Sequence, residues 1–109
     1  MKSVDPLKIK KIHFIGIGGT SMSGLAHIAL HKGFQISGSD MRPCAYTEKF
    51  EREGHPIAIG HRGENIPDDC DLVVYTAAIH SSNPEMVEAA RRGLPIMQRK
   101  EFLGYLTTL

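Results

Sequence analysis

The sequence predicts one α/β domain in which parallel strands alternate with helices. Short apolar, β-branched runs alternate along the chain with segments whose apolar residues recur at helical spacing. Glycines stand at most of the junctions between these segments, where a chain must turn. The 109 residues suffice for one hydrophobic core and are too few for two ordinary domains. We expect an N-terminal extension over residues 1–10 and the domain over residues 11–109.

The first segments form a unit of strand, turn, helix and strand. The run Ile12–Ile17 is apolar and bounded by glycines, which predicts a buried strand. The next segment has apolar residues at helical spacing and is expected to end at Gly33; the face comprises Met22, Leu25, Ala26 and Ala29. Phe34–Ser37 predicts a second short strand, and Asp40 closes the unit.

Two further strands and a short helix follow. Tyr46–Glu53 predicts a helix that ends at Gly54, and Pro56–Ile59 predicts a third strand. Leu72–Tyr75 reads Leu-Val-Val-Tyr and has no polar position, as expected for a central strand covered by helices on both faces.

The last part of the chain predicts a helix, a strand and a second helix. Asn83 suits the N-cap, Pro84 the first helical position and Gly93 the end of the first helix. Leu94–Met97 predicts the fifth strand, and residues 99–107 a final helix. Because the chain stops at Leu109 without a capping glycine or proline, we expect a longer parent protein.

Together these segments predict a Rossmann-like, doubly wound sheet of about five parallel strands with helices on both faces. In such sheets the ligand binds at the carboxyl ends of the strands.

Composition excludes several classes of protein. The formal net charge is +1 and the only tight basic cluster comprises Lys8, Lys10 and Lys11, so we expect no nucleic-acid partner. No stretch approaches the ~18 apolar residues of a membrane helix, and no secretory signal is evident, so we expect no membrane partner. The two cysteines lack Cys-x-x-Cys spacing, which favours reduced thiols in a cytoplasmic protein.

A glycine-rich turn follows the first predicted strand. Gly16, Gly18 and Gly19 let the backbone turn sharply and approach a ligand where a helix begins, an arrangement suited to phosphate groups. Ser21 stands where the dinucleotide fingerprint Gly-x-Gly-x-x-Gly has its third glycine. A serine hydroxyl can donate to a phosphate oxygen. The alternative interpretation is a turn that merely connects strand to helix.

Other candidate site residues follow the later strands. Asp40 comes about twenty residues after the glycines, where a carboxylate can accept hydrogen bonds from ribose hydroxyls. His61 follows the third strand and can donate to a ribose, a base or a phosphate. Thr76, Ala77 and Ala78 follow the fourth strand and suit close approach to the same ligand. Asp40 as a solvated turn residue and His61 as an exposed loop residue remain the alternatives.

Three other motifs are incomplete. His27 and His31 lack the glutamate of a metalloprotease motif, so we expect no metal site there. Residues 19–23 resemble a nucleophile elbow, but Ser23 replaces its final glycine. The sequence has no Gly-Lys-Ser or Gly-Lys-Thr and therefore no P-loop for ATP. We predict no catalytic residue.

Several blocks in order resemble the N-terminal domain of the Mur ligases of bacterial cell-wall synthesis, from about residue 11 to the end. The blocks are His13–Gly19, Met22–Gly24, Ser37–Asp40, Gly60-His61, Thr76–Ile79, Asn83–Glu85, and Arg99 with Glu101 and Leu103.

The resemblance implies that the domain holds the UDP part of UDP-N-acetylmuramate. The glycine turn with Ser21, Met22 and Ser23 would face the pyrophosphate, Thr76 to Ala78 would help line that site, and Asp40 and His61 would face the uridine. The family commonly has glycine where Ser21 stands.

For the parent protein the resemblance implies an ATP-dependent ligase. It would phosphorylate a carboxylate to an acyl phosphate, which an amine then attacks, with Mg²⁺ stabilising the transferred charge. The ATPase and C-terminal domains would follow in the same chain, so we expect residues 1–109 alone to bind substrate without turning it over and to need no cofactor.

Three alternatives remain open at this point. A murein-peptide recycling ligase of the same family recognises the same UDP-muramoyl group. The NAD(P)-binding domain of an oxidoreductase fits the strand, the turn and Asp40, although Ser21 counts against it. A free-standing regulatory nucleotide sensor would suit the lack of catalytic groups.

Overall fold

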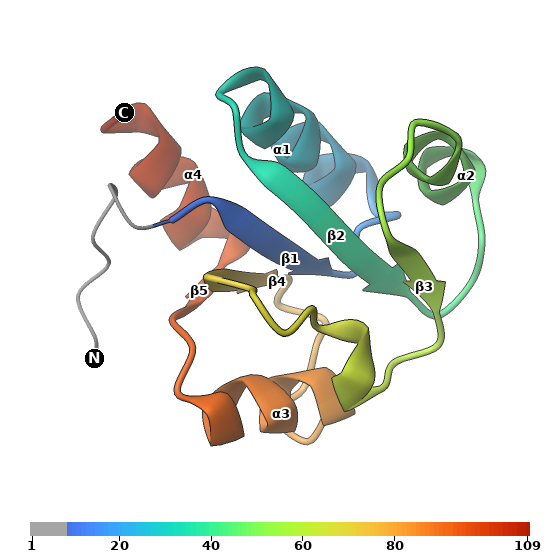
Figure 1. Ribbon diagram of the computed structural model, residues 1–109, viewed down its shortest axis with the longest axis vertical. Coiled ribbons are helices and arrows are strands. Elements are labelled where there is room, and N and C mark those ends of the chain that lie inside the picture. The colour runs from blue at the N-terminus through green and yellow to red at the C-terminus, as the bar shows by residue number, and fades with distance from the viewer. Residues whose placement is uncertain (1–8) are drawn as a thin grey trace.

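The computed structural model describes residues 9–109, so most of the expected N-terminal extension lies outside the described residues. Five parallel strands form one sheet in the order β3-β2-β1-β4-β5 (Figure 1). The elements are β1 (Lys11–Ile15), α1 (Thr20–His31), β2 (Gln35–Asp40), α2 (Ala45–Arg52), β3 (Ile57–Ile59), the 3₁₀ helix η2 (Gly63–Asn65), β4 (Leu72–Tyr75), α3 (Pro84–Arg92), β5 (Ile96–Gln98) and α4 (Arg99–Thr107).

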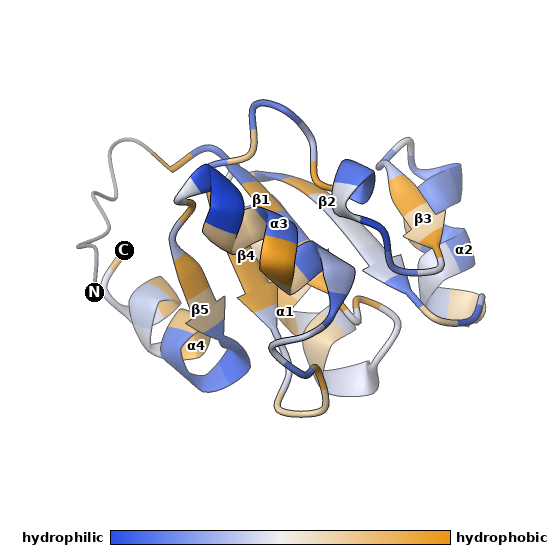
Figure 2. Ribbon diagram, turned by 90° about the horizontal axis from the view of Figure 1, so that it is seen from below, coloured by the Kyte–Doolittle hydropathy of each residue, from blue (hydrophilic) through white to orange (hydrophobic). Residues whose placement is uncertain are grey.

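Helices cover both faces of the sheet, which confirms the predicted doubly wound α/β fold. The helices α1, α2 and α4 lie on one face, and α3 lies on the other (Figure 1). Viewed from below, β4 and β5 form a hydrophobic centre between helices that are more hydrophilic (Figure 2). None of the helices in residues 9–109 has the length and apolar character that crossing a membrane requires.

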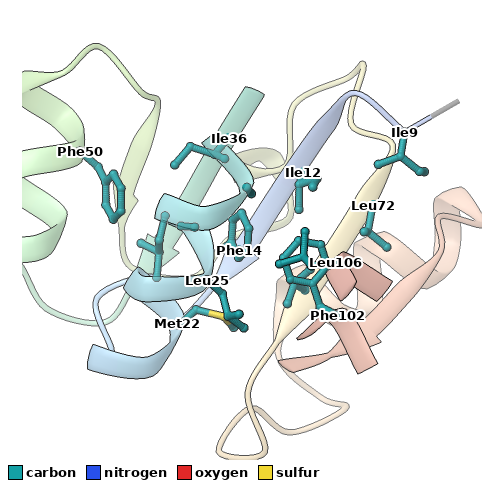
Figure 3. Packing of buried hydrophobic residues seen from close by; sticks show 14 residues of the cluster. Ile9, Ile12, Phe14, Met22, Leu25, Ile36, Phe50, Leu72, Phe102 and Leu106 are labelled. Atoms are coloured by element: carbon teal, nitrogen blue, oxygen red, sulfur yellow. The ribbon is translucent and has the colours of Figure 1, made fainter. Parts of the chain in front are cut away.

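The main hydrophobic core lies between the sheet and the helices α1, α2 and α4 (Figure 3). Phe14 of β1 meets Phe102 of α4 edge to face, with ring centroids 5.6 Å apart. The apolar face that the sequence predicts for α1 is buried in this core, and it comprises Met22, Leu25, Ala26 and Ala29. A smaller cluster under α3 contains Ile15, Val73 and Ala89.

Because side chains alternate along a strand, the two faces of β1 and β2 differ in chemistry. Ile12 and Phe14 point into the main core, whereas His13 points to the α3 face. On β2, Ser37 and Ser39 pair in register with His13 and Ile15 and share that face. The α3 face of the sheet therefore carries buried polar side chains.

The strand β2 extends beyond the predicted Ser37 to Asp40 because of two local features. A Cβ at Gly38 would lie 2.6 Å from Cδ1 of Ile17, so only glycine allows the glycine turn to pass so close to the strand. Ser39 is fully buried, and its carbonyl accepts hydrogen bonds from the N–H groups of Gly16 and Ile17. The strand β2 therefore continues to Asp40.

Candidate functional site

The glycine turn leaves the start of α1 open. Gly16 has φ +88°, a left-handed conformation that favours glycine. Gly19 is the N-cap of α1 and has no side chain to cap the helix, and the first turn contains no acidic residue. The N–H groups of Thr20, Ser21 and Met22 have no acceptor in the described part of the chain. This end of α1 thus presents bare donors and the positive end of the helix dipole.

Asp40 joins the end of β2 to the glycine turn. Its Oδ2 accepts a hydrogen bond of 2.8 Å from the N–H of Gly18, and its Oδ1 accepts one of 2.8 Å from the N–H of Met41. A carboxylate oxygen can accept a second hydrogen bond, so Asp40 retains capacity for a ligand hydroxyl. Asp40 both shapes the turn and faces the cleft.

A cleft of about 410 Å³ opens at the carboxyl ends of the strands. Seven of the predicted site residues line it: Gly16, Gly18, Gly19, Asp40, His61, Thr76 and Ala78. Five residues outside the predicted set also line it: Met41, Arg42, Pro43, Cys44 and Ile79. The loop after β2 thus supplies one wall of the cleft, including a cationic side chain.

Four predicted site residues do not line the cleft. Ser21 and Ala77 are exposed beside it, and the side chain of Met22 is buried in the main core. The hydroxyl of Ser23 donates to the carbonyl of Thr20 over 2.9 Å, and its N–H donates to Gly19. Met22 therefore offers only its backbone N–H to a ligand, and the donors of Ser23 are already used.

A buried polar network adjoins the cleft and centres on Glu85, in the first turn of α3. Glu85 is fully buried and accepts four hydrogen bonds. His13 Nε2 and Ser39 Oγ reach its Oε1 over 2.5 and 2.9 Å. His61 Nδ1 and Asn65 Nδ2 reach its Oε2 over 3.0 and 3.1 Å. The network thus connects β1, β2, α3, η2 and the loop after β3.

The carboxyl group of Glu85 is ionised because its donors outweigh its burial. Burial alone raises the pKa of Glu85, but hydrogen bonds and charge from His13, with hydrogen bonds from Ser39 and His61, lower it from 4.5 to about 2. The position of Glu85 in the first turn of α3 further favours a negative charge. Four donors fill the acceptor sites of an ionised carboxylate.

His13 and Glu85 were not selected as site residues from the sequence. Glu85 is the second residue of α3, where an acidic side chain usually stabilises the helix end in solvent. His13 occupies an apolar strand, and its Nδ1 hydrogen-bonds Ser37 Oγ over 2.7 Å. The alternation along β1 places His13 opposite the face of Ile12 and Phe14, which is one sequence signal for its role. The other is the family resemblance, whose blocks His13–Gly19 and Asn83–Glu85 include both residues.

Acid should weaken the fold through Glu85. A carboxyl whose pKa falls from 4.5 to about 2 on folding stabilises the protein above its ordinary pKa and loses that contribution as the pH falls toward 2. We expect this group to contribute about 3 kcal/mol to the decline of the unfolding free energy over that range. Urea unfolding at a series of pH values checks this, since Glu85→Gln should lack that portion of the decline. Equal declines in both proteins would contradict it.

The sheet order, the open helix end and the cleft at the carboxyl ends of the strands define a Rossmann-like domain of the kind that holds nucleotides. The family model "Mur ligase family, catalytic domain" matches residues 11–109. The chain therefore belongs to the Mur ligase family, which confirms the resemblance. An oxidoreductase domain, one of the alternatives above, is not consistent with this membership.

Several known proteins of this family are similar to this chain over most of its length. It is 58% identical over 99 residues to UDP-N-acetylmuramate--L-alanine ligase of Clostridium botulinum, covering 91% of this chain and 21% of that protein. The structure of UDP-N-acetylmuramate-alanine ligase from Thermotoga maritima matches with a TM-score of 0.81 and 36% identity, over 85% of this chain and 21% of that one. A murein peptide ligase from Psychrobacter arcticus matches with a TM-score of 0.77 and 28% identity, over 88% of this chain and 20% of that one. The chain spans about a fifth of the length of these relatives.

Proposed function

We propose that this domain binds the UDP part of UDP-N-acetylmuramate as the N-terminal part of an ATP-dependent UDP-N-acetylmuramate:L-alanine ligase of peptidoglycan synthesis. The observation that carries the proposal is the uncapped start of α1, with three free N–H groups beside a cleft at the carboxyl ends of the strands. The names of the relatives described above support this substrate. Among the solved structures, identity to the L-alanine-adding ligase is 36%, against 28% and 32% to two murein peptide ligases.

The pyrophosphate would occupy the open end of α1. The N–H groups of Thr20, Ser21 and Met22 would donate to phosphate oxygens, and the helix dipole would favour their charge. Arg42, which also lines the cleft, would supply a positive charge to the same ligand.

The nucleoside would lie toward β2 and β3. Asp40 would accept hydrogen bonds from ribose hydroxyls while it keeps its bond to Gly18. His61 would contact the nucleoside from the next strand, and Thr76 and Ala78 would line the far wall with small side chains.

Residues 9–109 do not fit the ATP and Mg²⁺ of the parent reaction. The sequence has no P-loop, and residues 9–109 contain no group of three His, Cys, Asp or Glu side chains placed to hold a metal ion. In this proposal the chain positions the substrate, and other domains of the parent protein carry out phosphoryl transfer and attack by the amine. The chain alone should therefore be inactive.

Calorimetric titration of residues 1–109 tests the proposed ligand. UDP-N-acetylmuramate and UDP should bind to one site, whereas NADH and NADPH should give no saturable heat. Tight NADH binding without any response to uridine nucleotides would contradict the proposal.

Asp40→Ala should weaken UDP binding about tenfold and leave the fold intact. The substitution removes the bond that shapes Gly18 and an acceptor for ribose, and two hydrogen bonds near 0.7 kcal/mol each account for about a factor of ten. The matched control is Asp68→Ala, because Asp68 is exposed away from the cleft lining. Calorimetry measures the affinity and circular dichroism the fold. An unchanged dissociation constant would show that Asp40 is only a turn residue.

A further inference from the structure

We infer that Glu85 is a positioning residue which holds His61 with its proton on Nδ1, so that Nε2 faces the cleft as a hydrogen-bond acceptor. This inference rests on the proposed function, because it states what chemistry the nucleoside must bring to that point of the cleft. A ligand group there must donate an N–H or O–H, which a phosphate oxygen cannot do.

The proton on Nδ1 follows from what surrounds it. His61 Nδ1 lies 3.0 Å from Glu85 Oε2, and an ionised carboxylate can only accept. Ser39 Oγ lies 3.1 Å from the same nitrogen, but its hydroxyl hydrogen is donated to Glu85 Oε1. Both neighbours of Nδ1 therefore present lone pairs, and the nitrogen must carry the hydrogen.

Glu85 cannot turn away to relieve this arrangement. His13 Nε2 holds Oε1 over 2.5 Å. Asn65 Nδ2 holds Oε2 while it also donates to the carbonyl of Gly60, next to His61 in the chain. The carboxylate is fully buried, so no water competes for its oxygens. The donors on other elements thus fix the acceptor that orients His61.

The second ring nitrogen of His61 is free for a ligand. The side chain is 7% exposed and lines the cleft. Nε2 makes no hydrogen bond with a described residue and is not an enclosed polar atom. In a neutral imidazole with Nδ1 protonated, Nε2 is an acceptor.

This chemistry narrows the contact that the sequence left open for His61. A base, a ribose or a phosphate were all possible partners of an isolated histidine. With Nε2 as the acceptor, the matching groups of UDP are the N3–H of uracil and the ribose hydroxyls. His61 then accepts a hydrogen bond from the nucleoside, and the N–H groups at the start of α1 bind the phosphates.

Nitrogen NMR of the unmutated protein, residues 1–109 with labelled histidine, tests the tautomer directly. The ring nitrogens of His61 should show Nδ1 protonated and Nε2 unprotonated, both alone and with UDP bound. Protonation at Nε2, whether as the other tautomer or as imidazolium in the UDP complex, would overturn the inference.

Modified nucleotides identify the donor. The three analogues to compare with UDP are N3-methyl-UDP, 2′-deoxy-UDP and 3′-deoxy-UDP, each of which lacks one hydrogen-bond donor. We expect the one that lacks the donor to His61 to bind about fivefold more weakly than UDP, as for loss of one hydrogen bond near 1 kcal/mol. That analogue should lose nothing further in His61→Ala, since the partner is already gone. If each analogue loses the same affinity in the unmutated protein and in His61→Ala, UDP binding is supported and the acceptor role of His61 is wrong. If UDP itself does not bind, the proposed function fails.

Glu85→Gln tests the positioning role, because an amide can donate to Nδ1 as well as accept from it. We expect a mixture of His61 tautomers and an affinity for UDP about fivefold lower. Glu51→Gln, which changes an exposed glutamate on α2, should alter neither. An unchanged His61 spectrum in Glu85→Gln would overturn the role of Glu85. Should that variant not fold, the spectrum of the unmutated protein still decides the tautomer.

Discussion

Gly18→Ala is expected to lower the affinity for UDP about 100-fold, equivalent to about three hydrogen bonds of 1 kcal/mol each. A Cβ at this position would lie 2.8 Å from Asp40 Oδ2, 3.0 Å from Cys44 Sγ and 3.1 Å from Thr47 Cγ2. The turn must then move away from β2 and α2, which breaks the Gly18–Asp40 bond and misplaces the start of α1. We also expect the unfolding free energy to fall by about 1–3 kcal/mol.

Gly24→Ala provides a matched control with the opposite sign. Gly24 is exposed within α1, and a Cβ there meets nothing within 4 Å. Alanine should therefore stabilise the helix by about 1 kcal/mol and leave UDP binding unchanged. Calorimetry and urea unfolding measure both quantities for both variants. If Gly18→Ala and Gly24→Ala bound UDP equally well, the close approach of the turn to Asp40 would have no functional role.

His13→Ala is expected to lower the unfolding free energy by about 3–5 kcal/mol, the range for removing one partner of a buried ionised group. The substitution removes the donor 2.5 Å from Glu85 Oε1 and leaves a buried carboxylate with three partners. It also empties the volume of a fully buried ring. Urea unfolding near neutral pH measures the loss.

His80→Ala is the matched control for this prediction, because His80 is exposed in the loop before α3. Its effect should stay within about 0.5 kcal/mol. Combining His13→Ala with Glu85→Gln should cost at least about 1 kcal/mol less than the sum of the single effects, since the uncompensated charge is then absent. Additive losses would show that His13 acts only by filling space.

Most of the fold could be predicted because its signals are local. The helix α3 begins after Asn83 and ends at Gly93 as expected: the Asn83 side chain accepts from the N–H of Glu85, and Gly93 is left-handed. The predicted strand Leu72–Tyr75 matches β4. The 3₁₀ helix η2 was not predicted, because a single turn of three residues has no hydrophobic period to detect.

The cleft could be predicted in outline and the network behind it could not. Asp40 and His61 follow strands whose carboxyl ends meet at one edge, so their meeting depends on topology that the sequence indicates. The partners of Glu85 lie between 20 and 72 positions away from it in the sequence, and no local pattern predicts such distant contacts. Burial was equally hidden, because a glutamate in the first turn of a helix is ordinarily solvated. The hydroxyl of Ser23 donates to the carbonyl of Thr20, and the sequence did not indicate this, because a serine near a helix start can turn either toward a ligand or toward its own backbone.

The unlike faces of β2 also determine how the sheet can assemble. In the native register Ile36 meets the main core, while Ser37 and Ser39 reach His13 and Glu85. A shift of one residue would turn both serines into the apolar layer and Ile36 toward a buried carboxylate. Misaligned pairings are thereby penalised during folding, so the same polar side chains that orient His61 also ensure that Asp40 arrives opposite Gly18.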